Sequence, residues 1–253
     1  MKFADAHVHI GFFPCKAKNG ELFYYSPEKV FLALQRSNIS EFIFSSTDAV
    51  FYAEREAFVQ KEIKKMLPIS NQHGYAFCWI TLDMIRRDSE LSFLDVLPYS
   101  GIKLHARETD WSKNPDELHR IFKAARERYL PIMFHADDDF PPDLYEDFLS
   151  EYPDVKVCMA HARPVEKAIL VMKKFRQVYT DFSFAPIENV SKLFMNKELI
   201  PRIMFGSDIP APQRFIDQDI DSYLEERLKE LSCFYCHPYR DVFFSNMKHF
   251  LRK

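Results

Sequence analysis

The chain opens with Phe3-Ala4-Asp5-Ala6-His7-Val8-His9-Ile10-Gly11, a short apolar stretch that carries two histidines and ends in a glycine. This pattern predicts a β-strand, in which successive side chains alternate between the two faces. His7 and His9 then lie on the same face, and two neighbouring neutral imidazoles supply half of a site for zinc or a similar divalent ion. The same spacing also occurs with one buried and one exposed structural histidine, so the rest of the sequence must show whether these two bind a metal.

The composition limits the class of protein. The 253 residues, 47% of them hydrophobic, can bury one large core, which favours a large α/β barrel or two modest domains. A net charge of -3 gives no electrostatic attraction to nucleic acid. Met1 and Lys2 lead directly into the strand, so we expect no signal peptide, and no apolar run is long enough to span a membrane. Five scattered cysteines predict no disulfide framework, which fits a reducing cytoplasm.

Glycine is scarce, and its five positions exclude several classes of enzyme. None of them can build the G-x-G-x-x-G turn of a dinucleotide-binding fold or a P-loop. The G-x-S-x-G turn that presents a nucleophilic serine is also missing. The chemistry of this chain must therefore rest on other side chains.

Apolar runs and helical patterns alternate along the chain. Ser26-Pro27-Glu28 predicts a helix start, with a capping serine and a proline at the first helical position, and Asn114-Pro115-Asp116-Glu117 resembles a capping box. The expected strands are residues 3–10, 39–45, 75–80, 101–105, 131–135, 155–161, 178–184 and 202–208. Further helices are expected at residues 54–67, 88–97, 142–151, 164–174, 216–231 and 240–251.

Eight strands that alternate with helices predict a parallel sheet, and eight is the number that closes a (β/α)8 TIM barrel. An open, doubly wound sheet is the competing topology. No linker, repeat or low-complexity segment interrupts the chain, so we expect one α/β domain over residues 1–253.

Polar side chains stand at the carboxyl ends of several of these strands. His7 and His9 end the first, and His135, His161 and Asp208 end three others. In a (β/α)8 barrel the carboxyl ends of all strands meet at one mouth, so these side chains should converge. Burying them without a partner costs free energy, and a metal ion provides that partner. Each histidine taken singly could be structural, but together they predict a metal site.

The fourth strand carries Lys103 and His105, which point to the same face and so to the same mouth. Arg107 and Arg163 follow the fourth and sixth strands, where each could bind an anionic substrate or form an ordinary surface ion pair. Aromatic residues that could wall such a pocket are Trp111, Phe12 and Phe13.

These motifs resemble the amidohydrolase superfamily of metal-dependent (β/α)8 hydrolases. The likeness is to the branch that includes aminocarboxymuconate-semialdehyde decarboxylase and its lactonase relatives. Its matching pieces span nearly the whole chain and are residues 5–9, 101–105, the His135 and His161 strands and residues 205–210. The chain departs from the family after His161, where Ala162-Arg163-Pro164 stands in place of glycines.

The resemblance implies that His7, His9 and His135 bind the primary metal, with Asp208 as fourth ligand, as catalytic base, or both. His161 would be the catalytic imidazole. The favoured ion is zinc, with manganese or iron as alternatives, because a divalent metal lowers the pKa of bound water to about 7.

Lys103 leaves two models open. In some superfamily members a lysine in this strand is carboxylated and bridges two metals, which would place His161 and His135 on the second ion. In the other model, which we favour, one metal is bound and Lys103 acts through its charge.

The sequence therefore predicts a hydrolase that cleaves an amide, lactone or ester bond in a small, carboxylated substrate bound by Arg107, Arg163 and His105. A non-oxidative decarboxylase on the same site is the nearest alternative. A metal-dependent nuclease like TatD is disfavoured because that family has a glutamate in the fourth strand. A non-catalytic metal-binding protein is a further alternative. We expect a small-molecule partner, no nucleic acid or membrane, and an optional homo-oligomer.

Cys233-Phe-Tyr-Cys236-His237 matches the attachment motif of c-type haem. Haem attachment requires export, which the start of the chain does not predict. A structural role or weak metal binding is the preferred interpretation.

Overall fold

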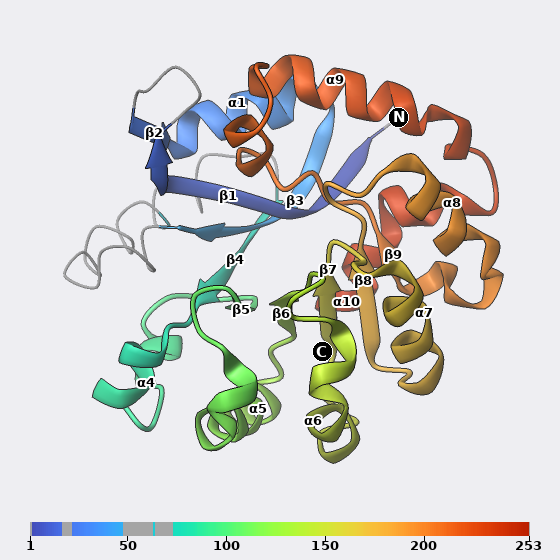
Figure 1. The fold of residues 1–253 in the computed structure, drawn as a ribbon. Coiled ribbons are helices and arrows are strands. Elements are labelled where there is room, and N and C mark those ends of the chain that lie inside the picture. The colour runs from blue at the N-terminus through green and yellow to red at the C-terminus, as the bar shows by residue number, and fades with distance from the viewer. Residues whose placement is uncertain (1, 17–21, 48–62, 64–72, 253) are drawn as a thin grey trace.

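A computed structural model describes residues 2–16, 22–47, 63 and 73–252, with the backbone alone at residues 12–16, 22 and 23. Its centre is a curled, nine-stranded sheet in the order β2-β1-β3-β4-β5-β6-β7-β8-β9 (Figure 1). Neighbouring strands run parallel except β2, which pairs antiparallel with β1. The strands are β1 Phe3–Lys16, β2 Leu22–Tyr25, β3 Ile39–Ser46, β4 His73–Trp79, β5 Gly101–Leu104, β6 Ile132–His135, β7 Val157–Ala160, β8 Val178–Asp181 and β9 Ile203–Met204. The predicted α/β class and sequential strand order are confirmed.

Helices cover the outer face of the sheet, and α1 lies beside α9 (Figure 1). They are α1 Pro27–Arg36, α4 Leu82–Arg87, α5 Pro115–Arg128, α6 Glu146–Glu151, α7 Val165–Lys174, α8 Ile187–Met195, α9 Ile220–Glu230 and α10 Ser245–Leu251. The Ser26 side chain accepts a hydrogen bond from the Lys29 amide, and Pro27 occupies the first turn, as predicted for α1. No helix within the described part of the chain is both long and apolar enough to cross a membrane.

The two ends of the parallel sheet approach each other. Three backbone hydrogen bonds join β1 to the segment after β9: Ala6 to Phe205 at 2.8 Å, Asp208 to His7 at 2.8 Å and His9 to Ile209 at 2.7 Å. These bonds place Asp208 beside the two histidines of β1.

The interior of the curled sheet is divided into an apolar and a polar end. The apolar cluster consists of Ala4, Ala6, Ile43, Phe77, Met133, Cys158, Ala160 and Met204 from the strands, with Met247 and Phe250 from α10. Helix α10 thus packs against one end of this interior, and the strand-end polar residues lie at the other.

Several predicted helix boundaries were wrong for local reasons. Residues 88–97 form no α-helix and contain only a 3-10 turn at Ser92–Asp95. Helix α4 ends at Arg87, and the Asp88 carboxylate accepts hydrogen bonds from the Glu90 and Phe93 amides and the Ser92 hydroxyl. These local bonds compete with helix formation. The Asn114 side chain donates to the Asp110 carbonyl, so the predicted capping box is not formed.

The late helices are shorter than predicted. Helix α9 starts at Ile220 because Asp219 caps it, accepting from the Ser222 amide at 2.8 Å. A 3-10 turn at Tyr239–Phe243 precedes α10, so residues 240–251 form no continuous helix. The predicted helix 54–67 lies outside the described residues except for Ile63.

Candidate metal centre

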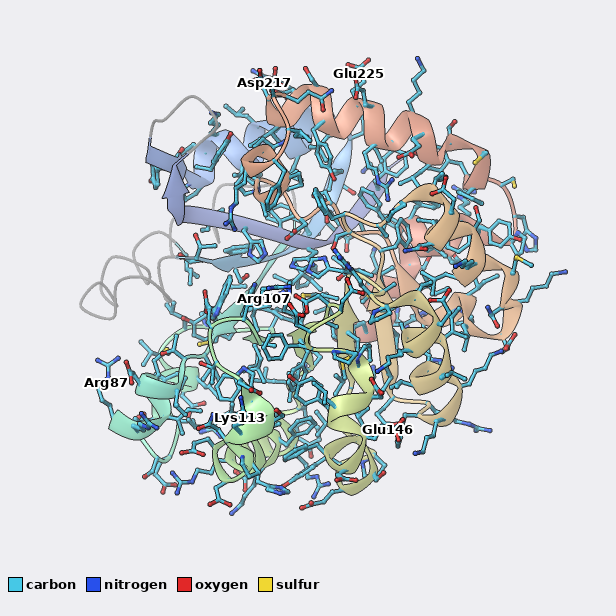
Figure 2. The ribbon with its side chains drawn as sticks, in the orientation of Figure 1. Arg87, Arg107, Lys113, Glu146, Asp217 and Glu225 are labelled. Carbon is cyan, nitrogen blue, oxygen red and sulfur yellow. The ribbon has the colours of Figure 1, made fainter. Side chains whose placement is uncertain are left out.

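A cavity of about 690 Å³ opens at the carboxyl ends of the strands. Every predicted site residue lines it, and they are His7, His9, Lys103, His105, Arg107, His135, His161, Arg163 and Asp208. Figure 2 places Arg107 toward the middle of the molecule, whereas Arg87, Asp217 and Glu225 lie at its edge. The alternation of strands and helices therefore brings the predicted residues of separate strands to one place.

His7, His9 and Asp208 form one of two groups of potential metal ligands among the described residues. The Nε2 atoms of the two histidines are 3.1 Å apart, and Asp208 Oδ1 lies 3.4 Å from that of His7 and 3.2 Å from that of His9. Zinc–nitrogen bonds of about 2.0–2.1 Å in a tetrahedral site put ligand atoms about 3.3 Å apart. The spacing of these atoms thus fits one such ion.

The outer nitrogens of the two rings are held by other side chains. His7 Nδ1 lies 3.2 Å from Asp181 Oδ2, and His9 Nδ1 lies 2.9 Å from Ser45 Oγ. Burial lowers the pKa of His7 to about 3, helped by the nearby Lys103 ammonium, and burial also lowers the pKa of His9. Both rings are therefore neutral at pH 7, with Nε2 directed at the centre, as metal binding requires.

Asp181 is the site residue that the sequence analysis missed. It is fully buried at the end of β8 and joins His7 and His161 in a second group of potential ligands. Its Oδ1 accepts hydrogen bonds from the amides of His161 and Ser183 at 3.1 and 2.9 Å. A signal was present, because Asp181 is a lone carboxylate inside the apolar run of residues 178–184.

His135 lies beside His161 rather than within either group of ligands found among the described residues. His135 Nδ1 is 3.1 Å from His161 Nε2, and its Nε2 is 2.8 Å from Asp137 Oδ2. Ser183 Oγ lies 2.9 Å from His161 Nδ1. The predicted ligand His135 thus contacts the predicted catalytic imidazole, while His7, His9 and Asp208 contact one another.

Lys103 lies below the mouth, with its side chain fully buried and Nζ 2.9 Å from His7 Nε2. Burial lowers the pKa of its amine, against the opposing charges of Asp208 and Asp181. His105 lies above it, stacked between the rings of Trp79 and His135 at centroid distances of 5.3 and 4.1 Å.

Backbone strain gathers at these residues. Asp208, His161 and Ala162 have φ of 61°, 70° and 47°, in the left-handed region that non-glycine residues rarely adopt. Gly206 is required by close packing: a Cβ there would lie 3.0 Å from His7 Cβ and 3.2 Å from Asp181 Cβ.

Residues 87–233 match the model of the amidohydrolase family. This chain belongs to the amidohydrolase family. Because the members are metal-dependent enzymes, the chain is an enzyme of the metal-dependent amidohydrolase kind. No curated protein matches the chain.

Solved amidohydrolase structures share the fold over the whole chain. A structure described as amidohydrolase II has 16% identity and a TM-score of 0.70, covering 100% of both chains. A zinc-bound amidohydrolase from Burkholderia multivorans has 12% identity and a TM-score of 0.69, covering 98% of both. 5-Carboxyvanillate decarboxylase from Sphingomonas paucimobilis has 10% identity and a TM-score of 0.66, covering 99% of both.

The two arginines predicted to bind substrate in this amidohydrolase are already paired. Arg107 donates to Asp137 at 2.5 Å and to Asp139 at 2.8 Å, and Arg163 donates to Asp138 at 2.7 and 2.5 Å. These bonds link the loops that follow β5, β6 and β7.

Three aromatic residues were predicted to form part of the pocket wall. Trp111 is wholly buried in the outer core and lines no part of the cavity, so its predicted place in the pocket wall was wrong; Trp79 stands there instead. The side chains of Phe12 and Phe13 lie outside the described residues.

Cys233 and Cys236 of this amidohydrolase are exposed beside a 3-10 turn, Leu231–Phe234. Neither belongs to a group of three potential metal ligands among the described residues.

Proposed function

We propose that this amidohydrolase cleaves an amide, lactone or ester bond in a small, carboxylated molecule. The observation that carries the proposal is the convergence of His7, His9 and Asp208 at ligand spacing on the wall of a 690 Å³ cavity. A cavity of this size suits a small molecule. We infer that the sheet closes into a (β/α)8 barrel of one domain, supported by the three backbone hydrogen bonds between β1 and the segment after β9.

His7, His9 and Asp208 would hold one divalent ion, for which we favour zinc. Such an ion acts as a Lewis acid and lowers the pKa of a bound water. Lys103 would stay unmodified and contribute positive charge beside His7.

Asp208 is suited to move the proton of the attacking water. Burial raises the pKa of its carboxyl, but His7 and His9 outweigh burial and hold the pKa below its usual value, so it is ionised at neutral pH. The carboxylate can accept the proton and pass it to the leaving group. His161, oriented by Ser183, would polarise the substrate carbonyl or carry a second proton.

Non-oxidative decarboxylation is the second candidate. The observation in its favour is the shared fold with 5-carboxyvanillate decarboxylase over the whole chain. The same cavity offers cations for a carboxylate, namely the buried Lys103 and the exposed Arg214.

One experiment separates the two reactions. Metal-loaded protein is incubated with small carboxylated amides, lactones, esters and aryl acids in 18O-labelled water. Hydrolysis incorporates one labelled oxygen into the product, whereas decarboxylation releases carbon dioxide. Asp208→Asn is the control and should lose activity by about 10²–10⁴-fold. Turnover that is unchanged in Asp208→Asn would contradict the proposal.

A further inference from the structure

The cavity wall carries three arginines, and they differ in their partners. Arg107 and Arg163 each form ion pairs with aspartates. Arg214 also lines the cavity, but no carboxylate among the described residues pairs with it. A guanidinium without a carboxylate partner at a cavity wall is available for an anionic ligand.

The acidic groups of the cavity are all engaged elsewhere. Asp137 contacts Arg107 and His135, and Asp208 contacts the β1 histidines. Glu108 accepts a hydrogen bond from the Trp79 indole at 3.2 Å. The positive charge of Arg214 is therefore not neutralised by the carboxylates that line the same wall.

Arg214 is fixed relative to the metal centre by a short stretch of chain. It ends the 3-10 turn Ala211–Arg214, whose first amide donates to the Asp208 carbonyl at 2.8 Å. The Arg214 guanidinium lies 5.4 Å from the ring centroid of Phe215, within the range of a cation–π contact. A ligand bound by Arg214 thus lies in the same cavity as the catalytic carboxylate.

Beside Arg214 the cavity wall is aromatic and exposed. Phe184 and Phe215 have 44% and 64% of their surface exposed, and their ring centroids are 5.8 Å apart. Phe184 has a φ of 58°, which the surrounding loop must stabilise. Two large apolar side chains exposed side by side at a cavity provide contact area for a flat, apolar ligand group.

We propose that Arg214 binds the substrate carboxylate, while Phe184 and Phe215 contact the flat, apolar body that carries it. Arg107 and Arg163 instead hold the loops around the mouth. This assignment rests on the proposed function for its substrate, but the binding step is independent of turnover. Arg214 is then the residue that determines specificity for a carboxylate.

The test uses benzoate and its neutral analogue benzamide as probes, with binding to zinc-loaded protein measured by calorimetry. We expect the wild type to bind benzoate at least tenfold tighter than benzamide, the equivalent of about 1.4 kcal/mol. Arg214→Gln should bind the two probes equally. Arg107→Gln and Arg163→Gln are matched controls at the same mouth and should keep the preference. Phe215→Ala should weaken both probes by a similar factor.

Retention of the benzoate preference in Arg214→Gln would overturn the proposal and point to the metal as the carboxylate ligand. Loss of the preference in Arg107→Gln or Arg163→Gln, with metal content intact, would overturn it in favour of those arginines. A wild-type protein that binds no benzoate would contradict the assigned ligand class. If the protein turns out not to be a hydrolase, the preference for benzoate over benzamide in each variant is unchanged. Failure of the hydrolase proposal can therefore be told apart from failure of the Arg214 assignment.

Discussion

Asp181 determines which nitrogen of His7 faces the metal centre. Its carboxylate lies against Nδ1, so that Nε2 faces His9, Asp208 and Lys103. Because a carboxylate behind a metal-binding histidine orients the ring and raises its basicity, Asp181→Asn should weaken metal affinity by about 10–100-fold. The affinity is measured by competition with a chelator.

The matched control for this substitution is Asp5→Asn. Asp5 is equally buried, but its Oδ1 accepts from the backbone amides of His7 and Ser207 and contacts no imidazole nitrogen, and burial raises its pKa to about 7. This variant should retain the metal. Equal affinities for Asp181→Asn and the wild type would show that Asp181 has no orienting role.

Glu108 should make the metal-free protein less stable as the pH rises. Glu108 is exposed as a residue, but desolvation of its carboxyl at the cavity wall raises the pKa from 4.5 to about 8, against the Trp79 hydrogen bond and Lys103. Between these two values the folded chain keeps a proton that the unfolded chain has lost, so the free energy of unfolding falls with increasing pH. Glu108→Gln removes this loss of stability. The difference in melting temperature between the variant and the wild type should therefore be larger at pH 9 than at pH 5. Equal differences at both pH values would show that Glu108 ionises normally.

The number of bound metals depends on whether the Lys103 amine is carboxylated. With an unmodified amine 2.9 Å from His7, the protein should hold one ion per chain, and the uncharged variant Lys103→Met should hold the same number. Elemental analysis measures the ratio, and the intact mass tests for a carboxylated lysine. Two ions per chain in the wild type, reduced in Lys103→Met, would establish the bridged site instead.

Residue types and spacing were enough to predict which side chains reach the cavity, because a strand alternates its faces and ends at a turn. They were not enough to predict how those side chains pair. The ring of His135 turns toward His161 because Asp137 binds its other nitrogen, and Arg107 pairs with that same Asp137. Such pairings depend on loops that follow different strands, which no local pattern describes.

At the scale of elements, the segment after β9 has little room for larger side chains. Gly206→Ala would bring a Cβ against the side chains of His7 and Asp181. We expect a loss of stability of roughly 1–3 kcal/mol from overpacking, and weaker metal binding because both residues must shift. Chemical denaturation and metal titration measure the two effects.

Gly74→Ala provides the comparison. The atoms nearest to a Cβ at Gly74 would be those of the Phe42 and Phe44 rings, at 3.1–3.2 Å, so the variant should lose stability but not metal affinity. Loss of metal in both variants, in proportion to stability, would show that the effect of Gly206→Ala is global rather than local.

Each of the eight predicted strands is present, although β1 is longer and β9 is shorter than predicted, and β2 was not predicted. A buried parallel strand is a short apolar run between turns, and that signal is local. Helix ends instead depended on single side chains such as Asp88 and Asp219, which bond to nearby amides and end or begin a helix where the apolar pattern continues. The 3-10 turn before α10 had no counterpart in the pattern.

For the whole molecule, metal removal should lower thermal stability. His7 lies on the first strand and Asp208 on the segment after the last strand, so an ion bound by both connects the two ends of the sheet. At a free zinc concentration of 100 times the dissociation constant, binding adds about 2.7 kcal/mol, or roughly 5–11 °C in melting temperature for a chain of this size.

The double variant with His7→Ala and His9→Ala should show no dependence of melting temperature on zinc. Thermal scans over a range of buffered zinc concentrations measure this dependence. A rise in melting temperature that persists in the double variant would mean that the stabilising ion binds elsewhere.

The stack of Trp79, His105 and His135 gives this protein an optical signal of its own. Trp79 lines the cavity, where its indole N–H donates a hydrogen bond to Glu108, so its surroundings change when the cavity is filled. The second tryptophan, Trp111, is sealed in the core and supplies a constant background. Emission from Trp79 should therefore follow cavity filling and metal loading without any added dye, and Trp79→Phe should abolish the change.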